Sequence, residues 1–165
     1  MPGIKPAAFP FNEEEREMNT HVTPNAAEAE IRLLVAEWSA ALEARDTERL
    51  TAAYTDETVL YDAIPPWRTV GRAAIKAAWD ACMPHLPERF TSRHDELEVK
   101  VFGDVALIHG LHRMVPEDGE HTCGMTHVRI TSVLRRAGGR WQVEHEHVSV
   151  PFDPMTGQVA AITEI

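Results

Sequence analysis

The chain has 165 residues, of which 44% are hydrophobic and 25% are charged, and its formal net charge is -10 at pH 7. This length and balance are typical of one soluble globular domain with a core of its own. The negative charge argues against a nucleic-acid partner, because phosphate binding requires clustered Lys and Arg side chains. It also disfavours an anionic substrate unless a local basic pocket exists.

The cysteines and the first residues bear on the compartment. Cys82 and Cys123 belong to no CxxC or zinc-type spacing, and such a pair fits a reducing cytosol. The first residues carry prolines and acids in place of a long apolar stretch, which is unlike a signal peptide. No apolar run approaches the length of a membrane span. We therefore expect a cytoplasmic protein with no membrane partner.

The N-terminal half predicts an arm followed by helices. Residues 1–24 are rich in Pro, Glu and Asn without a sustained period, so we expect an extended or partly disordered arm. A domain at residues 25–153 and a C-terminal tail at 154–165 follow. Asp46 is expected to cap a short second helix within residues 47–55. The first helix is predicted from apolar residues at helical spacing, namely Ile31, Leu34, Val35, Trp38 and Leu42.

The rest of the chain alternates between turn signals and β-prone segments. A strand at Thr58–Tyr61 is expected to end near Asp62, where Pro65 and Pro66 force a loop. Gly71 precedes a third predicted helix. Two hairpins follow, with turns at residues 103–104 and 138–139. Helices first and antiparallel strands after predict an α+β domain, with the helices packed on one face of a curved, mainly antiparallel sheet.

The segment VEHEHVSVPFD, residues 143–153, carries the clearest functional signal. As a strand it places His145, His147 and Ser149 on one face, because alternate residues point the same way. Trp141 and Val143 precede them at the same spacing, so we expect this face to be buried and the histidines to line a cavity or its mouth.

The register of the last hairpin decides which residues lie beside these histidines. A two-residue Gly-Gly turn pairs residue 132 with 145 and 130 with 147. A slip by one residue would instead bring Arg129, Thr131 and Val133 to the histidine face. Both registers remain open.

The nine histidines raise a second interpretation. His145 and His147, with His127 or His109, could supply three imidazoles to zinc or iron. The chain has no HExxH motif and no Cys pair, and half-buried histidines ordinarily bond to carbonyls or hydroxyls, so we expect no metal and no other cofactor. GxSxG, P-loop and GxGxxG motifs are absent, which disfavours nucleophile-elbow hydrolysis and nucleotide binding.

The order helix, short helix, strand, helix and four-strand meander resembles the NTF2-like superfamily of cystatin-like α+β cones. Within it, the chain is similar to the SnoaL-like and ketosteroid-isomerase-like proteins. The resemblance spans roughly residues 26–153 and is carried by EWSAALEARDTERLTAAYTDETVLYDAIPPWRTVGRAAIKAAW, VFGDVALIHG and RRAGGRWQVEHEHVSVPFD. It implies a cone-shaped cavity and a homodimer formed through the outer face of the sheet, with the tail packing on the partner subunit.

The resemblance also implies individual site residues. Ketosteroid isomerases place an aspartate base at the end of the first strand, and the matching residue is Asp62. Their oxyanion hole uses a tyrosine on the first helix and a protonated aspartate on the sheet, and these positions fall on Trp38 and near Thr131. A threonine cannot replace a carboxylic acid donor, and each lost donor costs about 10²–10³-fold in rate. Steroid isomerisation itself is therefore not expected.

These observations predict Asp62 and His147 as an acid–base pair. Desolvation beside the two prolines would raise the pKa of Asp62 above its reference of about 3.9. A pocket histidine would exchange protons near working pH. Substrate contacts are expected from Trp38, Tyr61, Trp67, His127, Arg129 and His145.

The function that these residues predict is a cofactor-independent isomerase, cyclase or dehydratase that acts on an apolar or aromatic molecule. Two alternatives stay open. One is a non-catalytic module for ligand binding or dimerisation. The other is a metal enzyme that uses the histidine cluster.

Overall fold

The computed structural model describes residues 26–119, 121–163 and 165, so the predicted arm at 1–24 lies outside the described residues. The helices are α2 (Ala26–Glu43), α3 (Thr47–Leu50) and α4 (Arg72–Cys82), with 3₁₀ turns η1 (Met83–His85) and η2 (Thr122–Gly124). The strands are β1 (Tyr54–Tyr61), β2 (Thr69–Val70), β3 (Phe90–Phe102), β4 (Val105–Pro116), β5 (Val128–Ala137) and β6 (Arg140–Ser149).

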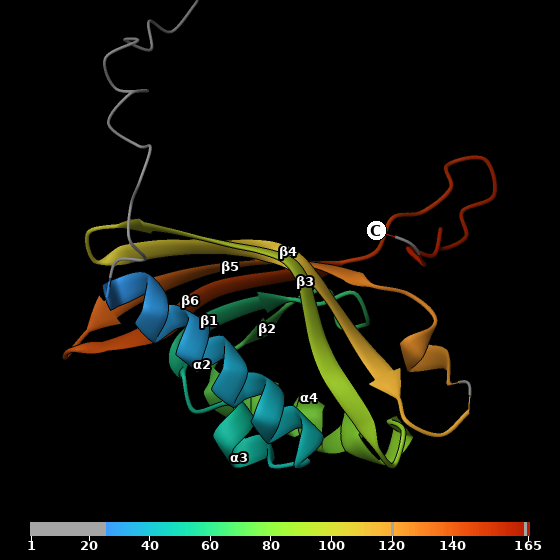
Figure 1. Ribbon diagram of the computed structural model, residues 1–165, viewed down its shortest axis with the longest axis horizontal. Coiled ribbons are helices and arrows are strands. Elements are labelled where there is room, and N and C mark those ends of the chain that lie inside the picture. Colours follow the sequence, from blue (N-terminus) through green and yellow to red (C-terminus); the bar gives the residue numbers. More distant parts are fainter. Residues whose placement is uncertain (1–25, 120, 164) are drawn as a thin grey trace, which may run out of the picture.

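The strands form one six-stranded sheet in the order β2-β1-β6-β5-β4-β3. The β1–β6 pair is parallel and the other pairs are antiparallel. The α-helices lie on one side of the sheet, and no described helix covers the opposite side, which we call the outer face (Figure 1). The α+β architecture predicted from the sequence is therefore confirmed.

Helix α2 forms because its apolar stripe packs against the sheet. Ile31 and Leu42 on this stripe are fully buried. Ile31 packs with Ile108 and Trp141 from the sheet, whereas Leu42 packs in a second cluster near the end of α4.

As predicted, Asp46 caps α3, since its Oδ1 accepts a hydrogen bond of 3.0 Å from the backbone N of Arg49. Within the described residues, no helix is long and apolar enough to cross a membrane.

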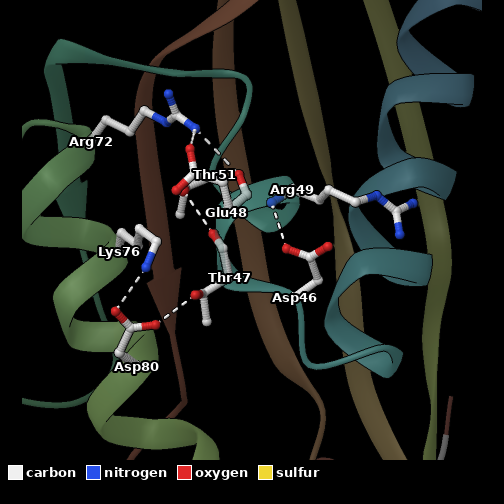
Figure 2. A network of polar contacts seen from close by, with 8 residues as sticks. All are labelled: Asp46, Thr47, Glu48, Arg49, Thr51, Arg72, Lys76 and Asp80. Carbon is white, nitrogen blue, oxygen red and sulfur yellow. Dashed lines mark hydrogen bonds and ion pairs between the residues drawn. The ribbon is translucent and has the colours of Figure 1, made fainter.

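A polar network joins α3 to α4 (Figure 2). The Thr47 hydroxyl donates to Asp80 Oδ1 at 2.5 Å, and Lys76 Nζ donates to Asp80 Oδ2 at 2.9 Å. The Arg72 guanidinium pairs with the Glu48 carboxylate. The Thr47 hydroxyl and Lys76 together lower the pKa of Asp80. Exposed ion pairs add little stability, so the network chiefly fixes where α4 lies over the sheet.

The long β3–β4 hairpin bends toward the helices (Figure 1). A bulge interrupts its register between Asp95 and Glu98, and Glu96 adopts a φ of 51°. Gly110 lies opposite, where an added Cβ would come within 3.0 Å of the Glu96 carbonyl oxygen and of Leu97 Cα. A side chain at position 110 would therefore push the bulge away, and glycine allows the two strands to curl over the helices.

A second bulge, at Glu144, changes the side of the sheet to which the following β6 side chains point. Near the turn Leu134 pairs with Val143, but beyond it Val133 pairs with His145. Glu144 is the extra residue, so each predicted register is present on one side of the bulge. Alternation of side chains is interrupted there, and Val143 and Glu146 both face the helices.

The second helix and the first strand differ from the prediction. Helix α3 ends at Leu50, and β1 begins at Tyr54, four residues before the predicted start at Thr58. The buried Thr58 hydroxyl accepts from the backbone N of Thr55 at 2.8 Å and donates to the Val143 carbonyl at 2.5 Å. This side chain ties the irregular start of β1 to β6, a long-range contact that local propensity does not reveal.

We predict that Leu42→Ala lowers the free energy of unfolding by about 2–5 kcal/mol, because Leu42 is fully buried and the substitution leaves a cavity. The matched control is Leu33→Ala on the same helix, where the side chain is 60% exposed and the change should stay within about 0.5 kcal/mol. Urea unfolding followed by tryptophan fluorescence measures both. Equal losses in the two variants would contradict the assigned core.

Candidate functional site

A cavity of about 880 Å³ lies between α2, α4 and the helix-covered face of the sheet. Trp38 and Trp79 enter it from the two helices, and Leu60, Ile108 and Val148 enter it from the strands. Its wall is mainly apolar, with a few polar groups, as in small-molecule sites. The volume is within the range that holds a drug-sized molecule.

One side of the cavity carries a carboxyl group bound to a phenol. The Tyr54 hydroxyl donates to Glu146 Oε2 at 2.5 Å, and the Ser132 hydroxyl lies 3.4 Å from Glu146 Oε1. Burial raises the pKa of Glu146, and the nearby Asp62 charge raises it further, against the two hydrogen bonds. Burial and the Glu146 carboxylate raise the pKa of Tyr54 well above its usual value, so the phenol keeps its proton.

Asp62 lies in the same cavity, directly after β1. Burial raises the pKa of this carboxyl, and hydrogen bonds from the backbone of Ala63 and Ile64 partly offset the effect. The bond from the Ala63 N–H measures 2.6 Å and fixes the orientation of the carboxylate. Since Asp62 also raises the pKa of Tyr54 and Glu146, the three groups influence one another across the cavity.

Two imidazoles enter the cavity from the bent hairpin. The rings of His94 on β3 and His112 on β4 lie 4.8 Å apart between centroids. Burial lowers the pKa of His94, and burial with the nearby His94 lowers the pKa of His112 to about 3. His112 Nε2 is 2.9 Å from the Ser92 hydroxyl, and His94 Nδ1 is 3.2 Å from the Ser39 hydroxyl. Both rings are therefore held in fixed orientations, and His112 stays neutral at physiological pH.

Trp38 lies between the Tyr54–Glu146 pair and the two imidazoles of His94 and His112. Its ring contacts His112 at 5.3 Å and Trp79 at 6.0 Å, both edge-to-face. The indole N–H is buried and has no hydrogen-bond partner within the described residues. It lies close enough to Tyr54 to lower the pKa of the phenol slightly. A buried donor without a partner costs free energy, which an oxygen atom of a ligand would recover.

Two of the predicted site residues lie in the cavity. Asp62 and Trp38 both line it, as expected. His145 and His147 do not, because the Glu144 bulge turns them to the outer face. There His147 pairs with Thr131, and His145 Nδ1 contacts the Val59 carbonyl at 2.9 Å. The expectation that the two histidines and the position of Thr131 border the cavity is wrong.

The remaining predicted contacts also lie outside the cavity lining. Tyr61 contacts His145 and His147 edge-to-face, with ring centroids at 5.0 and 6.0 Å. Trp67 is 76% exposed beside it. Arg129 is exposed and pairs with Ser149, so it also belongs to the outer face. Their contact with a ligand was predicted because the face of β6 that carries His145 and His147 was expected to be buried. That face is the outer face of the sheet.

His127 is buried but faces away from the cavity. Its ring contacts Asp95 Oδ2 at 3.2 Å and the Ile162 carbonyl at 2.9 Å. The metal-centre alternative therefore loses this ligand, since His127 is already engaged elsewhere. Among residues 26–119 and 121–163, no three His, Cys, Asp or Glu side chains come together in a way that could hold a metal ion.

Four polar residues of the cavity were not predicted as site residues: Tyr54, Glu146, His94 and His112. In an uninterrupted strand, Glu146 would share the face of Glu144, opposite the histidines, and the bulge places it inside. Tyr54 falls within residues 47–55, where a helix was predicted, but it begins β1. A regular hairpin turning at residues 103–104 would pair His94 with Arg113, and only the bulge between Asp95 and Glu98 brings His94 opposite His112, so no local signal in the sequence marks this pair.

The family and structure comparisons agree on the fold. The model of the SnoaL-like domain family matches residues 31–153. An NTF2-like protein of unknown function from Pseudomonas putida is 38% identical, with a TM-score of 0.78 over 85% of this chain and 97% of that one. No protein with a curated description matches the chain.

Two more distant structures share the fold. One is described as a proposed dehydratase of the NTF2-like family from Streptomyces avermitilis, with 22% identity and a TM-score of 0.65 over 79% of this chain and all (100%) of that one. The other is a proposed scytalone dehydratase from Novosphingobium aromaticivorans, with 14% identity and a TM-score of 0.64 over 85% of this chain and 93% of that one.

We predict that His112 makes the protein acid-sensitive. The folded state holds the ring neutral with a pKa of about 3, whereas the unfolded ring takes up a proton below its ordinary value of 6.5. The stability that the neutral ring contributes is present above pH 6.5 and falls as the pH falls toward 3. Between pH 6.5 and 5 the loss is about 2 kcal/mol.

Urea unfolding at several pH values measures this slope. His112→Gln should reduce it, and His109→Gln, which changes a histidine on the outer face, should leave it unchanged. A slope that is the same in His112→Gln and in the unaltered protein would contradict the assignment.

Proposed function

Because the chain belongs to the SnoaL-like family of the NTF2-like superfamily, we propose that it is an enzyme that acts on an uncharged, mainly apolar or aromatic molecule by acid–base chemistry. The reaction class is an isomerisation, a cyclisation or a dehydration that needs no cofactor. The observation that carries this proposal is a single apolar cavity in which carboxyls of raised pKa face imidazoles of lowered pKa.

The charge of the cavity wall supports an uncharged substrate. No Lys or Arg lines the cavity within the described residues. A bound carboxylate or phosphate would therefore lie beside Asp62 and Glu146 without a compensating cation, which is costly in an apolar surrounding. A ketone, phenol or alcohol carries no such penalty and can accept a hydrogen bond from the Trp38 N–H.

The chemistry begins with Asp62. A carboxylate whose pKa is raised toward neutrality is a better base than an ordinary aspartate, and Asp62 would remove a proton from carbon next to a carbonyl. The electron pair moves onto the carbonyl oxygen, and the Trp38 N–H donates to that oxygen. Isomerisation is completed when Asp62 returns the proton at another carbon. Titratable groups with shifted pKa values in one cleft are typical of such sites.

Dehydration requires a second group for the leaving hydroxyl. His94 is the candidate, because Ser39 binds one ring nitrogen and no described residue hydrogen-bonds to the other. In its imidazolium form, His94 donates a proton to the departing hydroxyl as the C–O bond breaks and water leaves. The electron pair of the broken C–H bond forms the C–C double bond, and Asp62 keeps the proton taken from carbon. Return of that proton from Asp62 to His94 restores both groups for the next turnover. His94 replaces His147 in the relay role predicted from the sequence.

Nucleophilic catalysis has less support. Cys82 and Cys123 both border the cavity. Burial raises the pKa of the Cys82 thiol, which keeps it protonated and a poor nucleophile. The Ser132 hydroxyl lies 3.4 Å from the Glu146 carboxylate, and within the described residues no imidazole is hydrogen-bonded to it to accept its proton.

We also propose a homodimer through the outer face. Half-buried apolar residues run across its centre, namely Val59, Leu107, Leu111 and Val133. They leave a sheet face that a second copy can cover, and exposed Phe152 and Met155 of the tail would pack against that copy.

We predict that Asp62→Asn slows hydrogen–deuterium exchange at the carbon between the ring and the carbonyl of 2-tetralone by about 10²–10⁴-fold, because the base is lost. The affinity for 2-tetralone should remain within about threefold, since the amide keeps the shape of the side chain. NMR in D₂O measures both quantities. Asp56→Asn is the control, because Asp56 is exposed outside this cavity.

An exchange rate that Asp62→Asn leaves unchanged would refute the assigned base. Binding without any catalysed exchange in the unaltered protein would instead favour the non-catalytic binding module.

We predict that Leu111→Arg gives a monomer, because it places a charge at the centre of the outer face. The control is Leu33→Arg on the exposed side of α2, which should leave the dimer intact. Sedimentation velocity at micromolar concentration distinguishes the two. A monomeric unaltered protein under these conditions would rule out the dimer.

A further inference from the structure

The C-terminal segment, residues 150–163, is one wall of the cavity. Val150 and Val159 line the cavity beside Thr126. Within the segment, a bridge pairs Phe152 with Val159, and the Ala160 N–H donates to the Pro151 carbonyl at 2.9 Å. Most of its side chains are nonetheless exposed. The segment therefore has its own hydrogen bonds but buries little apolar surface.

The backbone of Ile162 attaches the end of this segment to the domain. Its N–H donates to the Thr126 hydroxyl at 2.8 Å. Its carbonyl accepts from the His127 backbone N–H at 3.0 Å and lies 2.9 Å from Nδ1 of the same residue. The imidazole side chain is only 3% exposed, so water does not compete for these bonds.

Both ring nitrogens of His127 face acceptors. Nδ1 faces the Ile162 carbonyl, and Nε2 faces Asp95 Oδ2 at 3.2 Å. Arg93 is the main cause of a lowered pKa at Asp95, with a smaller contribution from His127, so the carboxyl is ionised. A neutral imidazole carries one N–H and could satisfy only one of the two acceptors, whereas an imidazolium satisfies both.

We propose that His127 is a protonation-dependent latch that holds the C-terminal segment against the cavity and loosens it when the ring loses a proton. The bond to a carboxylate is the stronger of the two, so the proton left on a neutral ring stays on Nε2. Nδ1 then presents a lone pair to the Ile162 carbonyl, and only the bonds of Ile162 to the Thr126 hydroxyl and the His127 backbone N–H remain. A rise in pH thus loosens this wall.

Charged groups lie beside the ring. Asp95 on β3 contacts it, and Arg93 is paired with Asp95. His112 on β4 is the other titratable group in electrostatic contact, and its lowered pKa keeps it neutral. His127 is a positioning residue, because it acts on the cavity through Ile162. Its effect on ligand access rests on the cavity being the ligand site, as proposed above.

The test combines two readouts on the full chain. NMR measures the protection of the Ile162 amide against hydrogen exchange from about pH 5.5 to about pH 8.5, corrected for the intrinsic exchange rate. Stopped-flow fluorescence measures the uptake rate of N-phenyl-1-naphthylamine, an uncharged apolar probe. Protection should fall about tenfold as the pH rises, as for one lost hydrogen bond, and uptake should accelerate by a similar factor.

His127→Gln should show low protection and fast uptake at every pH. His109→Gln is the matched control, because His109 also lies beside a carboxylate, Glu98, at 3.4 Å but on the outer face; it should behave as the unaltered protein does. Should His127→Gln fail to fold, ¹⁵N spectra of the unaltered protein decide the matter. Both ring nitrogens of His127 must carry hydrogen wherever Ile162 is protected.

Protection of Ile162 that does not change with pH, or a single ring proton in the protected state, overturns the latch. The two proposals fail separately. If the probe never enters while protection follows the pH, the latch stands and the proposed ligand site is refuted. If the probe binds and protection ignores the pH, the ligand site stands and the latch is refuted.

Discussion

The single extra residue Glu144 in β6 determines which chemistry faces the cavity. Without this bulge, strict alternation would place His145 and His147 beside Val143 and would turn Glu146 outward. With it, Glu146 faces Tyr54 and Ser132, and the histidines contact Tyr61 edge-to-face on the outer face. The bulge is held from the neighbouring strand, where the Thr58 hydroxyl donates to the Val143 carbonyl. Re-aiming a side chain next to a functional site is a common role of bulges.

The second constraint is a wall that carries carboxyl and imidazole groups but no Lys or Arg within the described residues. Burial raises the pKa of Asp62 and Glu146, while it lowers the pKa of His94 and His112. Desolvation thus shifts the pKa values of two carboxyls upward and those of two imidazoles downward, so the two kinds of group approach each other in proton affinity. The bend of β3 and β4 at Gly110 brings the imidazoles over the cavity, and the network between α3 and α4 fixes the opposite wall.

The sequence predicted the layers, the helix stripes, the hairpin turns, the placement of Asp62 after β1 and the family, because these follow from local periodicity, turn chemistry and element order. The sequence could not predict which side chains of β6 point into the cavity. Trp141 and Val143 correctly indicated a buried face, but nothing local marks Glu144 as an extra residue, and the contact that stabilises the bulge comes from Thr58, 85 positions away in the chain. For the same reason the role of His127 was not foreseen, since its acceptors lie 32 and 35 positions away.

The most direct test of the cavity as the site is an NMR titration of the protein with 2-naphthol, observed at the histidine ring protons. An uncharged aromatic molecule in the cavity should shift the signals of His94 and His112, whose rings border it. Those of His145 and His147 should stay in place, because the sheet separates them from the ligand. Shifts confined to His145 and His147 would contradict this account and would return the site to the outer face of the sheet.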